Sequence, residues 1–204
     1  MRASRGLAAL AGISALSLAG LVLASPAFAA TLPDGQRITV VANEFTGEFE
    51  ADNTYLDVNP ADAAGTQVGS VSSSVVTSID VDDNGLGYGT GVVSAGEPGP
   101  GIPMLYPVDA KNGVTGAGVP IVPVDPTVTI TNCHGIDYTA GVITLACMNQ
   151  PDAIAFSYLG TVTPAGDFTV LYHSVAQDET TFDFTAIAVD PTTGTLWAFG
   201  RNSE

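Results

Sequence analysis

The sequence predicts an all-β protein, and three observations lead to that prediction. Valine, isoleucine, threonine, tyrosine and phenylalanine are abundant after residue 30, and these side chains favour strands. The 23 glycines and 13 prolines fall mostly in short clusters, as expected of many turns between short strands. A hairpin-like pattern recurs along the chain, whereas leucine, lysine and glutamate runs at helical spacing are absent.

Residues 1–30 have the three parts of a cleavable secretion signal. Arg2 and Arg5 give a positive start, an apolar run spans 7–24, and Ala27-Phe28-Ala29 supplies the small residues of a cleavage site. The run is close to the lower length limit of a membrane-spanning helix, but the glycines and serines within it weaken membrane insertion. We therefore expect export and cleavage after Ala29 or Ala30, and a secreted, extracellular product.

Residues 31–204 are expected to form a single β-repeat domain that is strongly acidic. Three basic residues stand against 21 acidic ones after cleavage, a net charge of −18. Such a surface repels nucleic-acid phosphates and anionic lipid, so nucleic acid and membranes are not expected partners. The carboxylates are scattered rather than blocked, which argues against a disordered acidic tail.

The two cysteines predict a disulfide. A hairpin folded about Ala140 would bring Cys133 opposite Cys147, with Gly141 last in a three-residue loop where a positive φ is needed. Opposed strand positions are close enough for a disulfide, and export permits one. The alternative, a redox or metal-binding pair with His134, lacks the CxxC spacing and a complete zinc ligand set.

The same hairpin pattern occurs three times, in 77–89, 134–145 and 185–198. Each copy has a strand centred on an isoleucine (Ile79, Ile136 and Ile187), a turn that ends in glycine, and a second apolar or aromatic strand. A second element precedes each copy, and its strands are expected at 55–59 and 65–71, at 105–109, 114–116 and 119–124, and at 154–158, 160–162 and 168–172. Each cycle therefore carries about four short strands in roughly fifty residues, close to the blade period of radial repeat folds.

These segments resemble the repeats of bacterial extracellular β-propellers of the YVTN- and NHL-like groups. The resemblance rests on strands such as Tyr55-Leu56-Asp57-Val58 and Gly135-Ile136-Asp137, and it runs from about Tyr55 to Phe199. It implies a fold, a small or incomplete propeller-like array of about three to four blades, and no function, because propellers host many functions. The N-terminal segments 37–42 and 45–49 are candidates for a fourth blade, and a β-sandwich is the alternative architecture.

One segment resembles a calcium loop. Asp80, Asp82 and Asn84 precede Gly85 in the pattern D-x-D-x-[DN]-G, whose alternating oxygens begin such loops. The twelfth position is Gly91 instead of glutamate, and Tyr88 occupies the place where shorter propeller loops carry an acid. The alternative is a polar hairpin turn, because turn chemistry alone selects aspartate, asparagine and glycine.

No catalytic motif is evident. His134 and His173 are the only histidines, and Ser157 or Ser174 would complete a Ser-His-Asp site only by spatial coincidence, since no G-x-S-x-G elbow is present. The acidic pairs Asp82 with Asp83 and Glu48 with Glu50 suggest glycosidase chemistry but are expected by chance in so acidic a chain. Tyrosines in the strands and Trp197 would line a binding surface or, as we expect for most, fill a core.

The sequence therefore favours a secreted, non-enzymatic β-repeat module that binds an extracellular ligand or protein, or has a structural role. The alternative is a small secreted hydrolase with its site at a propeller mouth. Calcium is the one candidate cofactor, and the sequence is compatible with an oligomer.

Overall fold

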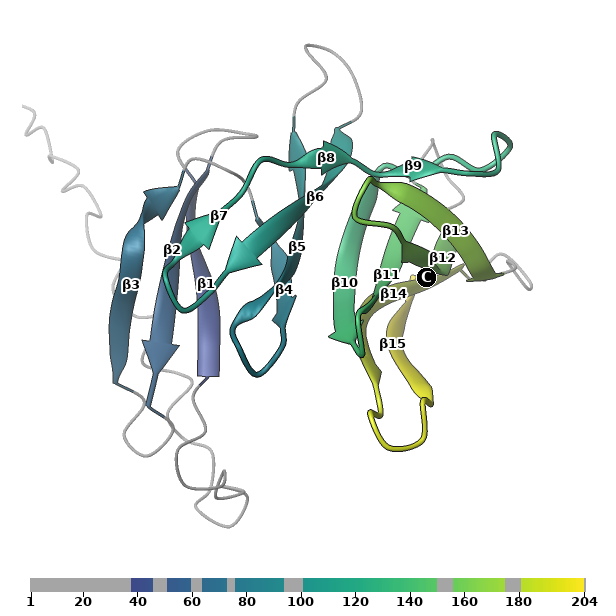
Figure 1. Ribbon diagram of the computed structural model, residues 1–204. Coiled ribbons are helices and arrows are strands. Elements are labelled where there is room, and N and C mark those ends of the chain that lie inside the picture. The colour runs from purple at the N-terminus through teal and green to yellow at the C-terminus, as the bar shows by residue number, and fades with distance from the viewer. Residues whose placement is uncertain are drawn as a thin grey trace, which may run out of the picture. The chain divides into compact units, whose positions relative to one another are not determined.

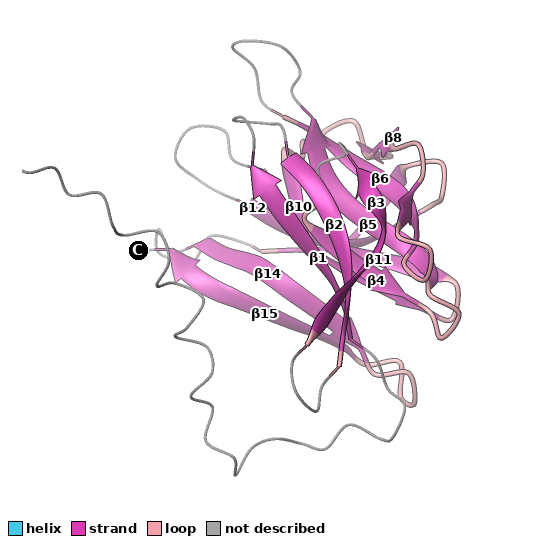
Figure 2. Ribbon diagram, turned by 90° about the vertical axis from the view of Figure 1, so that its left-hand side faces the viewer, coloured by secondary structure: helices cyan, strands magenta, loops and turns pink. Residues whose placement is uncertain are grey.

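A computed structural model describes residues 38–45, 51–59, 64–72, 76–93, 101–149, 156–174 and 181–203. All the regular elements in these ranges are strands (Figure 2), which confirms the all-β prediction. The described part of the chain contains no helix long and apolar enough to cross a membrane. The predicted signal, 1–30, lies outside the described residues.

The first sheet is an antiparallel meander of three strands, in the order β1-β2-β3 (Figure 1). Its strands are β1 (Ile38–Phe45), β2 (Ala51–Val58) and β3 (Gly65–Ser72). Tyr55 of β2 is fully buried and its hydroxyl is 2.7 Å from the Thr115 hydroxyl of the second sheet. The N-terminal strand predicted at 37–42 and the strands predicted at 55–59 and 65–71 are present, whereas most of 45–49 lies outside the described residues.

The second sheet has the order β4-β5-β6-β7, and β8 also pairs with β6. Its strands are β4 (Ser78–Val81), β5 (Leu86–Val93), β6 (Ile102–Asp109), β7 (Val114–Thr115) and β8 (Val119–Pro120).

The third sheet has the order β10-β11-β12-β13-β9, with β9 parallel to β13. Its strands are β10 (Asn132–Thr139), β11 (Val142–Asn149), β12 (Phe156–Val162), β13 (Asp167–His173) and β9 (Val122–Pro123). The predicted strand at 119–124 is therefore two short strands, the first in the second sheet and the next in the third. Proline lacks a backbone N–H, so these strands suit the edges of sheets.

The fourth sheet is the hairpin β14 (Thr181–Val189) and β15 (Leu196–Ser203). The four sheets are open, and none closes on itself within the described ranges. The structure thus confirms an all-β chain with several open sheets, while the propeller-like arrangement and its number of blades stay predictions.

The three predicted hairpins are β4–β5, β10–β11 and β14–β15, and they share one register. Ile79, Ile136 and Ile187 pair with Gly89, Leu145 and Ala198, and the following residues Asp80, Asp137 and Ala188 pair with Tyr88, Thr144 and Trp197. The second and third hairpins also carry a bulge at the same place, at His134 and Thr185.

The turn of the middle hairpin differs from its prediction by one residue. Thr139 pairs with Val142, so the loop has two residues, Ala140 and Gly141, with φ of 53° and 81°. Positive φ at both positions is the requirement of a type I′ hairpin turn. The bulge at His134 then adds one residue to β10 and restores the pairing of the two cysteines.

The main hydrophobic core lies in the third sheet and against the second. Its buried members include the disulfide and the largest apolar side chains of β10, β11 and β13: Leu105, Ile121, Ile130, Cys133, Ile136, Ile143, Leu145, Cys147, Val162 and Phe168. A smaller cluster joins Tyr55 of the first sheet to Val108 and Ala110 of the second. Strand β10 lies against β4 and β5, and β14 lies against β10, β11 and β12. The first strand of each later hairpin therefore covers the preceding sheet.

Candidate functional site

The predicted calcium loop forms the turn between β4 and β5, and Asp82 organises it. Its Oδ1 accepts hydrogen bonds from the backbone N–H groups of Asn84 at 2.8 Å and Leu86 at 3.0 Å, and the Asn84 Nδ2 lies 3.4 Å from its Oδ2. These hydrogen bonds lower the pKa of the Asp82 carboxyl, because they stabilise its ionised form, and the bond from Leu86 has the largest effect. Asp82 and Asn84 are thus brought together as parts of one turn.

Asp80 interacts with a different part of the molecule. Its Oδ2 accepts a hydrogen bond of 2.6 Å from the backbone N–H of Tyr138 on β10, and its Oδ1 accepts one of 3.0 Å from the N–H of Val81. Burial raises the pKa of the Asp80 carboxyl, the two hydrogen bonds lower it, and the charge of Asp137 raises it further. The carboxylate of Asp80 is therefore used in the junction between the second and third sheets.

Other turns use aspartate in the same way as Asp82. Asp190 accepts hydrogen bonds from the backbone of Thr192 and from Thr193, and Asp125 accepts two from Thr127. Asp109 accepts two from Asn112 in the turn after β6. This recurrence favours the turn interpretation of Asp82, since none of those turns has the calcium pattern.

The calcium site stays a prediction. Within the ranges that the structure describes, no group of three or more histidine, cysteine, aspartate or glutamate side chains is placed to hold a metal ion. Asp80, Asp82 and Asn84 would have to supply such a site together with backbone oxygens, and two of the three acceptors already receive hydrogen bonds from the protein.

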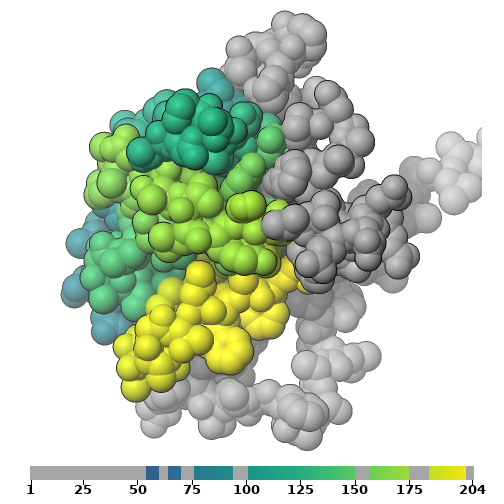
Figure 3. All heavy atoms as spheres, turned by 90° about the vertical axis from the view of Figure 1, so that its right-hand side faces the viewer, coloured from purple at the N-terminus to yellow at the C-terminus, as the bar shows by residue number. Residues whose placement is uncertain are grey.

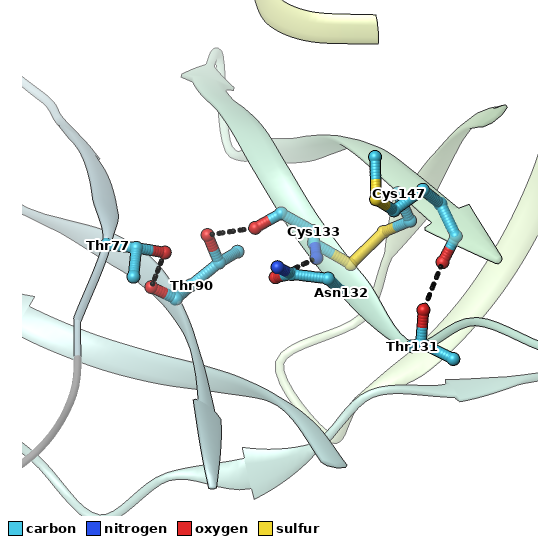
Figure 4. Close-up of a disulfide and its surroundings, with 7 residues drawn as sticks. Thr77, Thr90, Thr131, Asn132, Cys133 and Cys147 are labelled. Atoms are coloured by element: carbon cyan, nitrogen blue, oxygen red, sulfur yellow. Dashed lines mark hydrogen bonds between the residues drawn. A yellow bond between two sulfur atoms is a disulfide. The ribbon is translucent and has the colours of Figure 1, made fainter. Parts of the chain in front are cut away.

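The predicted disulfide between Cys133 and Cys147 is present, with an S–S distance of 2.03 Å (Figure 4). Both cysteines are buried, and the two strands are also joined by Thr131, whose hydroxyl donates to the Met148 carbonyl at 3.3 Å. The Cys133 carbonyl accepts a hydrogen bond of 3.1 Å from the buried hydroxyl of Thr90 on β5. The cysteines therefore have a structural role, because they link the two strands of a hairpin in the third sheet. The hydrogen bond from Thr90 connects this hairpin to the second sheet.

The junctions between successive sheets repeat one interaction that sequence reasoning missed. Asp80 accepts from the N–H of Tyr138, and Asp137 accepts from the N–H of Val189 at 2.7 Å. Tyr138 and Val189 occupy equivalent register positions, as do the two aspartates. The equivalent of Asp80 in the next hairpin is Asp137, and Asp80 binds the N–H of the residue that follows it, Tyr138. Asp137 in turn binds the N–H of Val189, which follows its own equivalent, Ala188. The signal in the sequence was the shared Ile-Asp pair at 79–80 and 136–137.

Asp137 is 7% exposed, and its second oxygen, Oδ1, has no hydrogen-bond partner among the described residues. In Asp80 the equivalent oxygen accepts a hydrogen bond from the N–H of the next residue, Val81. The residue after Asp137 is Tyr138, and its N–H already donates to Asp80. At the junction between the second and third sheets, the rings of Tyr88 and Tyr138 also meet edge to face, with their centroids 5.3 Å apart.

The residues considered for catalysis are dispersed. His134 is the bulged residue of β10, and His173 is exposed at the end of β13. The hydroxyl of Ser174 accepts from the backbone N–H of Ser157 at 3.0 Å, and that of Ser157 accepts from the N–H of Phe184 at 3.2 Å. Both serines are buried in structural roles, while Glu48 and Glu50 lie outside the described residues.

The aromatic side chains divide into two groups. Tyr55 and Tyr106 are buried, as expected of core residues, whereas Tyr172 and Trp197 are exposed by more than half. Phe199 on β15 and Leu171 on β13 are also exposed, and sequence reasoning did not single them out.

Comparison with known proteins adds no relative to this picture. No protein-family model matches the chain. A search of curated proteins also returned no match.

Proposed function

We propose that the chain is an exported, non-enzymatic β-repeat protein that acts as a binding or structural module. The observation that carries this proposal is the repeated carboxylate-to-amide bond between sheets, from Asp80 to Tyr138 and from Asp137 to Val189. Among the described residues, the buried Asp137, the partly buried Asp80 and the buried Ser157 accept hydrogen bonds from the next sheet, and the buried Ser174 accepts one within the third sheet. Enzymatic acids and bases need instead to reach a substrate.

We further propose that the repeat is propeller-like. The support is that three hairpins share one register and that each later first strand, β10 and then β14, lies against the preceding sheet. The disulfide supports export, because disulfides persist in oxidising compartments. A β-sandwich has only two packed sheets, and would not need the same polar contact to recur at successive junctions.

The test separates a module from a hydrolase. The mature protein and the variants Asp80→Asn and Asp137→Asn are assayed with chromogenic glycoside, ester and peptide substrates, and the wild type is applied to glycan and extracellular-matrix arrays. We expect no turnover above a buffer control for any of the three proteins, and retention on an array. Turnover that either substitution abolishes while the melting curve is preserved would overturn the proposal in favour of a hydrolase.

A further inference from the structure

One oxygen of Asp137 is buried at the junction between the third and fourth sheets without a hydrogen bond. Asp137 is 7% exposed, its Oδ2 accepts from the Val189 N–H at 2.7 Å, and its Oδ1 has no partner. Figure 3 shows the β14–β15 hairpin, in yellow, beside the third sheet. A buried carboxylate oxygen normally receives a hydrogen bond, and its absence is costly. A donor that reaches Oδ1 would therefore stabilise this junction.

The equivalent carboxylate, Asp80, indicates which donor that would be. Both of its oxygens are used, because Oδ2 accepts from the N–H of Tyr138 in the next hairpin and Oδ1 accepts at 3.0 Å from the N–H of the following residue, Val81. Asp80 and Asp137 occupy the same register position. The expected donor to Asp137 Oδ1 is therefore the N–H of the residue that follows Asp137, and that residue is Tyr138.

The Tyr138 N–H is thus the one donor that both carboxylates would use. It donates to Asp80 Oδ2 at 2.6 Å, a short distance for such a bond. An N–H that points at one acceptor cannot also make a well-aligned bond to a second. The two carboxylates also repel each other, since the charge of Asp137 raises the pKa of Asp80. The bond between the second and third sheets therefore deprives Asp137 of its local bond.

The side chains that adjoin Asp137 offer no substitute donor. Thr144 pairs with Asp137 on β11 and is buried, but its hydroxyl does not bind Oδ1. On β14 the described side chains of 184–189 include one hydroxyl, that of Thr185, which donates to the Phe199 carbonyl at 3.5 Å. The backbone amide that follows Asp137 is therefore the donor to consider.

We propose that the Tyr138 amide is a switch between the two junctions, and that it passes to Asp137 Oδ1 when Asp80 withdraws. Asp137 then binds with both oxygens, as Asp80 does now, and its carboxylate is fixed more firmly against the Val189 N–H. The second sheet can therefore release its carboxylate without weakening the attachment of the fourth. This inference is independent of the proposed function, because it concerns only how successive sheets are joined.

The test is amide hydrogen exchange, measured by NMR on the mature protein and on the variants Asp80→Ala, Asp137→Asn and Asp80→Ala/Asp137→Asn. Asparagine at position 137 keeps one oxygen for the Val189 N–H, but its second polar group is an NH₂ that cannot accept from Tyr138. Asp109→Ala is the matched control, since Asp109 belongs to the second sheet but accepts from Asn112 in its own turn.

In Asp80→Ala we expect the Tyr138 amide to stay protected within about threefold of the wild type, because Asp137 becomes its acceptor. The Val189 amide should exchange no faster than in the wild type. In the double variant Tyr138 has neither acceptor and should exchange at least about tenfold faster than in Asp80→Ala. Asp137→Asn and Asp109→Ala should each leave Tyr138 protected by Asp80.

Loss of protection at Tyr138 in Asp80→Ala, or faster exchange at Val189 in that variant, would overturn the proposal. So would equal protection of Tyr138 in Asp80→Ala and in the double variant, because Asp137 would then not be the second acceptor. If the double variant does not fold, the two amides of Asp80→Ala decide alone. An Asp80→Ala protein that does not fold also counts against the proposal, since the lost bond would have no replacement.

Discussion

The hairpins β10–β11 and β14–β15 have the same backbone plan but different surroundings. In both hairpins the strands pair in the same register relative to the isoleucine, and a bulge lies two residues before that isoleucine. In β10–β11 the face that leads to the next sheet carries Asp137 and Thr144 and is buried, whereas in β14–β15 it carries Ala188 and Trp197 and is exposed.

The difference teaches that side chains, not backbone geometry, decide what each copy of the repeat does. A small polar pair with a carboxylate suits a junction in which the next strand offers its backbone N–H groups. An alanine and tryptophan pair cannot accept those hydrogen bonds, but it buries apolar surface well against a complementary partner. The covalent link differs too, because Phe184 and Gly200 occupy the positions that correspond to the two cysteines.

The largest effect is expected from the disulfide that only the β10–β11 hairpin has. The double variant Cys133→Ser/Cys147→Ser should lose about 3 kcal/mol of unfolding free energy, because a closed loop of this length restricts the unfolded chain by about that amount. Urea titration monitored by far-ultraviolet circular dichroism measures the loss. Reductant should destabilise the wild type but not the variant, and equal midpoints for both proteins without reductant would contradict the prediction.

Exchanging the paired residues tests the comparison directly. Thr144→Trp places the residue of the exposed face into the buried one, and overpacking there should cost about 1–3 kcal/mol. The reverse exchange, Trp197→Thr, should change monomer stability by no more than about 0.5 kcal/mol, because Trp197 lies at the surface. Thermal unfolding at low protein concentration compares the two variants. Similar costs for both would mean that the two faces are equally covered.

The carboxylates can be exchanged in the same way. Asp137→Ala leaves the N–H of Val189 without its acceptor and should cost about 1–2 kcal/mol, with part of the loss offset by removal of the unpartnered Oδ1. Ala188→Asp should leave the stability of the dilute monomer within about 0.5 kcal/mol of the wild type, because its side chain is exposed. Urea midpoints measure both changes. A larger loss for Ala188→Asp would show that the fourth sheet has a covered face after all.

A smaller effect is expected from the pH dependence of the first junction. The folded-state pKa of Asp80 is raised, mainly by burial and partly by Asp137. The contribution of Asp80 is therefore fully present below its unfolded pKa, near 3.8, and is lost as pH rises through the folded value. Asp80→Asn should therefore gain stability relative to the wild type as the pH rises above about 4, by less than about 1 kcal/mol because Asp80 is partly solvated. A pH-independent difference between the two urea midpoints would contradict this prediction.

The smallest effect is expected from calcium. The oxygens of Asp82 already accept hydrogen bonds within the turn, and Asp80 binds the backbone of another sheet, so the melting temperature should be the same in calcium and in chelator. Asp82→Asn is the matched variant. A rise in melting temperature with calcium that this variant abolishes would establish the calcium site instead.

Local patterns in the sequence were sufficient to predict much of the fold. The three hairpins follow from isoleucine-centred strands and glycine-ended turns, and the disulfide follows from the near-symmetry of Cys133 and Cys147 about Ala140. The loop length at Ala140 was wrong by one residue, because a bulge at His134 has no distinct signature in a single sequence. The separation of 119–124 into two strands depends on which sheet edges happen to lie nearby.

The candidate site was harder to predict, because its interactions join residues more than fifty positions apart. Nothing local distinguishes Asp80, which binds Tyr138, from Asp82, which binds its own turn. The exposure of Trp197 could not be predicted either, since the sequence pattern around an aromatic residue in a strand is the same whether or not another sheet covers it. Both answers depend on the packing between sheets.

The short segment from β8 to β9 has a consequence for how the molecule would come apart. Within five residues the chain joins the edge of the second sheet at β6 and the edge of the third at β13. Hydrogen exchange should therefore find these two sheets opening as one cooperative unit. Among the described residues, no comparable segment pairs with both the β14–β15 hairpin and another sheet. This hairpin should therefore detach first under force or denaturant and leave the disulfide-linked remainder intact.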